Sequence, residues 1–122
     1  MSQITSFRDL MVWQKAMDLG VRTIEVARRL PRDEQMSLGH QLRKSAISIP
    51  SNIAEGFSRR STAFYIQHLW TSHASGAELQ TQLMLGSRAR LIEEPVAQAL
   101  VTDAEEIGRM IAGLVSALER GR

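Results

Sequence analysis

Apolar residues recur at the spacing of an α-helix in four segments of the chain, and short polar or proline-containing stretches separate these segments. Because the connections between neighbouring segments are short, we expect an all-α, up-down-up-down four-helix bundle that forms a single domain over residues 1–122. The pattern predicts the four helices at residues 7–29, 37–56, 61–91 and 95–120.

Residues with strong preferences at helix ends mark these boundaries. Ser6, with Asp9 three residues later, is placed to cap the first helix. Pro31 ends that helix because the residue before a proline is pushed out of helical geometry. Gly56 is expected to stop the second helix, and Pro95 suits the first turn of the fourth.

One stripe of each helix is expected to face the core. In the first helix the stripe comprises Leu10, Trp13, Met17, Gly20, Val21, Ile24 and Ala27. In the second it comprises Leu38, Leu42, Ser45, Ala46, Ile49 and Ile53. In the third it comprises Tyr65, Ile66, Leu69, Trp70, His73, Ala77, Leu83 and Met84. In the fourth it comprises Val96, Leu100, Ile107, Met110, Ile111, Leu114 and Leu118.

Three further apolar residues of the first helix, Val12, Leu19 and Val26, fall opposite its expected core face at intervals of seven. They are either a seam for another helix or scattered surface residues, which are common. Because the three align, we favour a subunit interface.

The second helix carries a polar row beside its apolar stripe, formed by Gln41, Ser48, Asn52 and Glu55. Pro50 lies in the middle, where it removes a backbone donor and should kink the helix. The row could bind a ligand or a partner. We favour the alternative that its side chains satisfy exposed backbone groups or bond to another helix.

Composition narrows the possible functions. The chain has no cysteine, which excludes disulfides, thiol catalysis and cysteine metal sites. It shows no signal peptide and no apolar run long enough to cross a membrane, so we expect a cytoplasmic protein without a membrane partner. The net charge is +2, but residues 1–92 carry twelve basic against seven acidic residues. Thirteen of the fifteen basic residues are arginine, which suits contacts with phosphate or carboxylate groups.

Catalysis is the weakest functional reading. No histidine has a glutamate three residues before it, as the di-metal sites of helical bundles require, and no cofactor is expected. His73 lies on an apolar stripe and fits a hydrogen-bonded core histidine. Asp103 falls on the inner face of the fourth helix, where an ion pair or a polar site would have to satisfy it.

A specific motif resembles a known family. The run from Ser48 to Gly56, followed by Arg59-Arg60-Ser61, closely resembles the four-helix-bundle family encoded in intervening sequences of bacterial 23S ribosomal RNA genes. The similarity covers roughly residues 7 to 92. It also includes residues 7–10, residues 12–16, Leu30-Pro31, Glu34, Leu38, Gln41, Leu42, Arg43, Gly76, Glu78-Leu79 and Thr81-Gln82-Leu83.

This resemblance implies a compact bundle that assembles into a ring-like homo-oligomer, a pentamer. Relatives include the accessory protein of diversity-generating retroelements, which assists a reverse transcriptase and contacts nucleic acid. The chain departs from the family at Phe64, where an acidic residue usually completes a capping box with Ser61. We therefore expect the start of the third helix to shift and Phe64 to cover an adjacent subunit.

The first functional hypothesis is a homo-oligomer that binds RNA or DNA, or assists a nucleic-acid enzyme, through phosphate contacts from repeated basic clusters. The clusters are Arg43 with Lys44, Arg59 with Arg60, and Arg88 with Arg90. The second hypothesis is a protein-interaction scaffold that docks through the polar row or through the acidic residues Asp103, Glu105 and Glu106.

Overall fold

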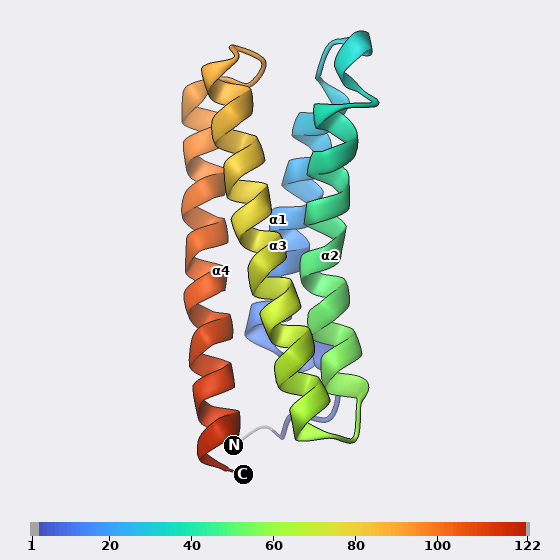
Figure 1. Ribbon diagram of the computed structural model, residues 1–122, viewed down its shortest axis with the longest axis vertical. Helices are drawn as coiled ribbons and strands as arrows, with labels where there is room; N and C mark the ends of the chain where they lie inside the picture. Colours follow the sequence, from blue (N-terminus) through green and yellow to red (C-terminus); the bar gives the residue numbers. More distant parts are fainter. Residues whose placement is uncertain (1–2, 122) are drawn as a thin grey trace.

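The computed structural model describes residues 3–121, and the helices it contains pack into a four-helix bundle with up-down-up-down topology (Figure 1). This confirms the fold class that the apolar pattern predicts. In chain order the elements are a 3₁₀ turn η1 (Phe7–Asp9), α1 (Met11–Arg28), a 3₁₀ turn η2 (Arg32–Glu34), α2 (Leu38–Ser58), α3 (Thr62–Arg88) and α4 (Glu94–Arg120).

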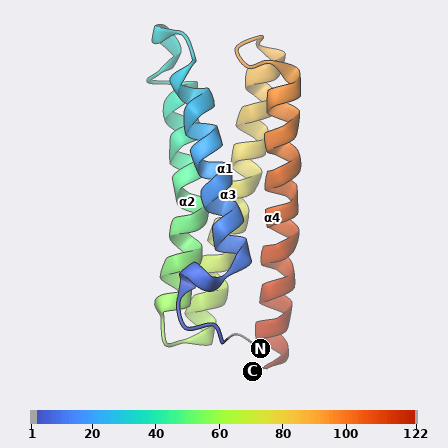
Figure 2. The same cartoon turned by 180° about the vertical axis from the view of Figure 1, so that it is seen from behind.

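Each helix packs against its neighbours in the chain, and α1 also packs against α4, which closes the bundle. The connection between α2 and α3 and the C-terminal end of α4 lie at one end of the bundle (Figure 1). The η1 turn lies at the same end (Figure 2). The other end carries the α1–α2 and α3–α4 connections. No helix within residues 3–121 has both the length and the apolar character needed to cross a membrane.

The cap predicted at Ser6 is present, but it caps the η1 turn rather than α1. The Ser6 side chain accepts a bond from the backbone of Arg8, and the Asp9 carboxylate accepts one from the backbone N–H of Ser6 at 3.1 Å. Leu10 then adopts an extended conformation, so the predicted single helix is divided before Met11. The backbone bonds from Thr5 and Ser6 also lower the pKa of Asp9 below its usual value.

Two arginines hold the connections at the opposite end. The Arg43 side chain donates to the backbone oxygen of Gln35 at 3.2 Å and to its side-chain oxygen. The Gln35 amide in turn donates to the part-buried carbonyl of Ala27 at 2.9 Å, in the last turn of α1. After α3, Arg90 adopts a left-handed backbone with φ of 63°, and the N–H of Leu91 returns to the Gly86 carbonyl at 2.8 Å.

Gly56 does not stop α2, which continues to Ser58. The glycine is buried where α2 meets α3, and an added Cβ would lie 2.8 Å from Cβ of His68 and 3.0 Å from Cδ1 of Tyr65. The reason for a glycine at this position is therefore close contact between two helices rather than a left-handed turn.

The apolar stripe predicted for α2 is confirmed, because Leu42, Ala46, Ile49 and Ile53 are all buried. The face predicted for α1 is wrong in part. Val12 and Leu19, predicted to form an outer seam, are 5% and 1% exposed and belong to the core.

Val26, the third residue of the predicted seam, is partly buried against the same core. Two residues predicted to face the core, Met17 and Val21, are instead 41% and 54% exposed. Both sides of this helix are apolar, so spacing alone assigns the wrong side to the interior. The seam cannot offer Val12 and Leu19 to a second subunit, because the protomer has already buried them.

The face of α3 differs from its prediction for a related reason. Ile66, Leu69 and Leu83 are buried as expected, but Trp70, Ala77 and Met84 are exposed. Small residues occupy much of the inward stripe, namely Ser72, Ser75, Gly76 and Gly86. In α4, Leu100, Ile107 and Ile111 are buried and Met110, Leu114 and Leu118 pack partly against the core, whereas Val96 is exposed.

Candidate nucleic-acid interface

Arg59 and Arg60 lie at the connection between α2 and α3, and both are exposed. The guanidinium of Arg59 lies 3.7 Å from the Glu55 carboxylate and 5.4 Å from the ring centroid of Phe64. Ser61 caps α3 by accepting a bond from the backbone N–H of Phe64 at 3.3 Å. The helix therefore starts at Thr62 without the acidic residue of a capping box, and the expected shift of its start does not occur.

Two more arginines from distant parts of the sequence lie at the same end of the bundle. Arg8 is in the η1 turn, which packs against α2, and its guanidinium lies 4.5 Å from the ring centroid of Phe7. Arg120 is in the last turn of α4. Both side chains are exposed. Because η1, the α2–α3 connection and the C-terminal end of α4 lie at the same end of the bundle (Figure 2), this end carries four arginines. We call Arg8, Arg59, Arg60 and Arg120 the arginine end.

The acidic residues near the arginine end are Asp9, Glu55 and Glu119. Two of them already have partners within the chain. Asp9 accepts bonds from Thr5 and Ser6, and Glu55 lies 3.0 Å from Nε2 of His68. The Arg59 guanidinium lies 3.7 Å from the Glu55 carboxylate. The other three arginines of this end have no carboxylate within 4 Å among the described residues.

Aromatic residues also concentrate at this end, which the sequence pattern did not reveal. Five of the six aromatic residues of the chain lie in η1, the first turn of α1 and the ends of α2 and α3 that meet here. Phe7 packs edge-on against Trp13, and Phe57 packs edge-on against Tyr65. Burial raises the pKa of Tyr65 above its ordinary value. Phe64 differs from these four because it is 50% exposed.

The other predicted basic residues do not join the arginine end. Arg88 and Arg90 lie at the opposite end, where Asp33, Glu34, Glu93 and Glu94 lie in or beside the same connections. Arg43 is engaged with Gln35, and Lys44 lines a small pocket on the α2–α3 side with Glu78. The structure thus distributes the six predicted phosphate contacts over three separate places.

The polar row of α2 is bonded within the protomer. The Ser48 hydroxyl lies 2.7 Å from that of Ser75 in α3, and the Asn52 amide donates to the Ser48 carbonyl and hydroxyl at 3.0 Å each. Oδ1 of Asn52 lies 3.1 Å from Nδ1 of His68. These bonds support the structural reading of the row, while Gln41 remains exposed beside it.

Pro50 is buried within a continuous α2. Its ring leaves the Ala46 carbonyl without the usual helical donor. That oxygen faces Gly20 of α1, where an added Cβ would lie 3.5 Å away. One turn away, the Ser72 hydroxyl of α3 donates to the Ile49 carbonyl at 2.8 Å. The proline therefore belongs to the packing of α2 against its two neighbours.

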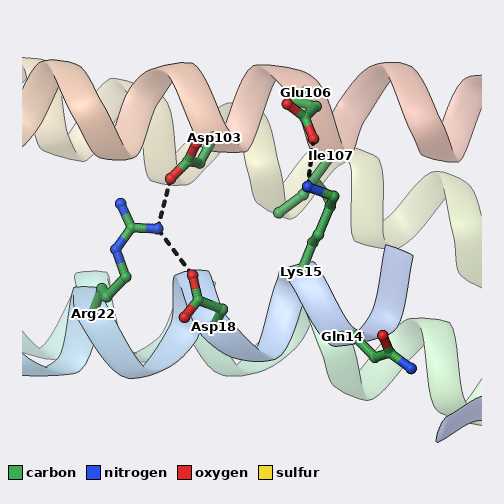
Figure 3. A pocket seen from close by; sticks show the side chains of 7 residues that line it. All are labelled: Gln14, Lys15, Asp18, Arg22, Asp103, Glu106 and Ile107. Carbon is green, nitrogen blue, oxygen red and sulfur yellow. Dashed lines mark hydrogen bonds and ion pairs between the residues drawn. The ribbon is translucent and has the colours of Figure 1, made fainter. Parts of the chain in front are cut away.

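Asp103 is satisfied by ion pairs across the groove between α1 and α4 (Figure 3). Arg22 reaches Asp103 at 2.6 Å and Asp18 at 3.1 Å, and Lys15 reaches Glu106 at 2.9 Å. These contacts raise the pKa of Lys15 and of Arg22.

The ion pairs line a pocket of about 260 Å³. Its acidic and basic groups largely engage one another, which leaves little unpaired charge for a ligand. Glu105, the third acidic residue of the predicted docking surface, is exposed on α4.

The histidines do not assemble a metal site. His73 is partly buried and packs edge-on against Trp70, beside Gly108 of α4. His68 is bonded to Asn52 and Glu55, and His40 is exposed. Across residues 3–121, no group of three or more histidine, aspartate or glutamate side chains is placed to hold a metal ion.

Comparison with known proteins agrees with this architecture. A crystal structure of a protein of unknown function, from the S23 ribosomal protein family of Bacteroides thetaiotaomicron, superposes with a TM-score of 0.80 and 24% sequence identity. The alignment covers 86% of this chain and 98% of that one, and it shows a shared fold. No protein of curated function is similar to the chain in sequence. Residues 8–113 match the 23S rRNA-intervening sequence proteins, and the chain belongs to that family.

Proposed function

We propose that this protein is a non-catalytic homo-oligomer that binds nucleic acid, or assists a nucleic-acid enzyme, through phosphate contacts from the arginine end. The observation that carries the proposal is the convergence of Arg8, Arg59, Arg60 and Arg120 from three separate segments. Arginine binds phosphate oxygens through two parallel N–H donors, and exposed guanidinium groups at one end of a bundle suit a polyanion.

Self-association would strengthen this surface, because each added subunit repeats the same arginines. The bundle has two exposed apolar stripes that suit such contacts. One lies on α1 and α2 and lines an apolar groove with Met17, Val21, Ile24 and Ile47. The other follows α3 at intervals of seven residues, with Trp70, Ala77 and Met84.

The first stripe lies on the α1–α2 side, and Met84 of the second lines a groove with Ala97 and Val101 on the α3–α4 side. These two sides are opposite, because α1 contacts α2, α2 contacts α3, α3 contacts α4 and α4 contacts α1 around the bundle. Two different surfaces on opposite sides of each subunit permit a head-to-tail contact, which closes into a ring when the rotation between subunits allows it. We therefore propose that the subunits assemble into a ring, for which a pentamer is the expected size.

A salt titration of binding tests the proposal. Fluorescence anisotropy would follow labelled RNA and DNA, single-stranded and duplex, at increasing concentrations of monovalent salt. We expect binding at low salt that weakens linearly on a log–log scale. Arg59→Ala with Arg60→Ala should weaken binding and reduce the slope by roughly one to two ions.

Arg88→Ala with Arg90→Ala is the matched control, because it removes the same charge from the opposite end of the bundle. We expect it to change the slope less. If the wild-type protein binds none of the four probes at low salt, the proposal fails.

That negative result would favour a protein-interaction scaffold. The polar row and the acidic face of α4 are no longer the best surfaces for such a scaffold, because most of their side chains are bonded within the protomer. The apolar groove on α1 and α2 would then be the surface available to another protein.

A further inference from the structure

We infer that the arginine end recognises an unpaired stretch of nucleic acid, in which Phe64 stacks against an exposed base while Arg59 and Arg60 contact the adjoining phosphates. This inference rests on the proposed nucleic-acid binding and adds the class of ligand. Paired arginines alone read only the phosphate backbone, which duplexes and single strands share.

Phe64 differs in exposure from the other aromatic residues at this end of the bundle. It lies in the first turn of α3 and is half exposed, although the other four aromatic residues at this end pack in two half-buried pairs. An exposed phenylalanine has no polar atom to satisfy, so its ring is available to another flat apolar surface.

The Phe64 ring is not an isolated apolar residue, because Arg59 lies beside it. The guanidinium of Arg59 lies over the Phe64 ring, with Cζ 5.4 Å from the ring centroid. Arg60 follows directly in the chain and is exposed. An aromatic ring beside arginines is the combination by which proteins hold single strands, because bases stack on the ring or the guanidinium plane while phosphates pair with the charge.

The surrounding structure holds this group in place. Ser61 fixes the first turn of α3 through its bond to the N–H of Phe64, and the Glu55 carboxylate lies 3.7 Å from the Arg59 guanidinium. Glu55 is itself held by His68 at 3.0 Å. The ring and the guanidinium therefore belong to a chain of contacts between α2 and α3 rather than to a free loop.

A duplex cannot use the ring in this way, since its bases are stacked inside the helix. Phe64 should therefore contribute to the binding of single strands and leave duplex binding unchanged. The contribution should not depend on salt, because no charge is removed with the ring.

The test compares one mixed-sequence RNA, alone and annealed to its complement, by fluorescence anisotropy at fixed salt. Phe64→Ala should weaken single-strand binding about five-fold or more, which is the effect of losing one stacked base, with an unchanged salt slope. Duplex affinity should stay within about two-fold. Phe64→Trp should restore single-strand binding, and its added emission should be quenched when the single strand binds.

Three outcomes would overturn the inference. The first is unchanged single-strand binding by Phe64→Ala, and the second is an equal loss of affinity for both probes. In either case nucleic-acid binding itself would still stand. The third outcome is a lower oligomeric mass of Phe64→Ala in light scattering, which would place the ring in a subunit contact. Failure of the wild-type protein to bind either probe at low salt would instead remove the proposed function, and this inference with it.

Discussion

At the scale of single residues, glycines in this bundle have different roles that the sequence does not separate. Gly56 was predicted to end α2 but lies inside it, against His68 and Tyr65 of α3. Gly113 also lies inside a helix, but an added Cβ would meet nothing within 4 Å. The same residue type thus permits close packing in one place and only weakens a helix in the other.

Replacing Gly56 with alanine should destabilise the protein. The new Cβ would lie 2.8 Å from Cβ of His68 and 3.2 Å from the Tyr65 carbonyl oxygen, so two helices would have to move apart. Overpacking of this kind costs about 1–3 kcal/mol. The free energy of unfolding, measured by urea titration, is the relevant quantity.

Gly113→Ala is the matched control. It should stabilise the protein by about 0.5–1 kcal/mol, because alanine is the better helix former and has room at that position. Equal effects of the two substitutions would contradict the role assigned to Gly56.

Asp9 provides a prediction about pH. Bonds from the backbone of Thr5 and Ser6 lower its pKa in the folded state, so the carboxylate stabilises the fold above its unfolded pKa. This contribution is lost as pH falls through the lowered folded-state pKa. Asp9→Asn should therefore reduce stability at neutral pH and have a smaller effect in acid.

The measurement is urea unfolding of both proteins at neutral pH and at a pH below the usual aspartate pKa, followed by tryptophan fluorescence. An equal difference in stability at the two pH values would show that ionisation of Asp9 is irrelevant to the cap.

Residue-level predictions of the site missed contacts between a helix and the segment that connects it to the next. Arg43 looked like a free cation beside Lys44, but it is bonded to Gln35 across a turn of the chain. Phe64 appeared only as a departure from a capping box, whereas the structure puts it beside Arg59. Helical spacing indicates neither contact, because each joins an element to its connecting segment.

At the scale of elements, the periodicity of apolar residues predicted the helices well but the buried face of each helix less well. It gave the correct face of α2, where Leu42, Ile49 and Ile53 contrast with polar neighbours. It failed on α1, because apolar residues occur on both sides, and on α3, because small residues such as Ser72 and Gly86 face inward. Side-chain size decides which residues fit between closely packed helices, and hydrophobicity alone does not predict it.

The α1–α4 contact differs from the others because ion pairs span it. Arg22 and Asp103 are both more than one-third exposed, so water screens their attraction. A double-mutant cycle with Arg22→Gln and Asp103→Asn should give a coupling energy of about 0.2–1 kcal/mol that falls with added salt.

The pair Lys15 and Glu106 offers a matched comparison on the same groove. Its coupling should be similar or smaller, since both side chains are 46% exposed. A coupling well above about 1 kcal/mol, insensitive to salt, would mean that the groove excludes water more completely than these exposures indicate.

At the scale of the whole molecule, the helix faces that were wrongly predicted to be buried are the best candidates for subunit contacts. Met17 and Val21 on α1, and Trp70 and Met84 on α3, look like core residues by spacing but are exposed. Residues of this kind are typical of surfaces that another subunit buries. The proposed ring uses the α1–α2 stripe of one subunit against the α3 stripe of the next.

Glutamate at exposed positions of either stripe should dissociate the assembly without unfolding the subunit. Val21→Glu with Ile47→Glu disrupts the first stripe, and Trp70→Glu with Met84→Glu disrupts the second. Met36→Glu is the control, because Met36 is 86% exposed but belongs to neither stripe. Light scattering should show loss of mass for both double variants and none for the control, while circular dichroism shows intact helices.

Mixing the two double variants distinguishes a head-to-tail contact from a two-fold one. In a head-to-tail assembly each variant retains the stripe that the other has lost, so one intact contact can form between them and no more. The mixture should therefore give a heterodimer, whereas each variant alone stays monomeric. A stripe that pairs with its own copy would instead leave one of the double variants dimeric by itself, and the ring would have to be abandoned.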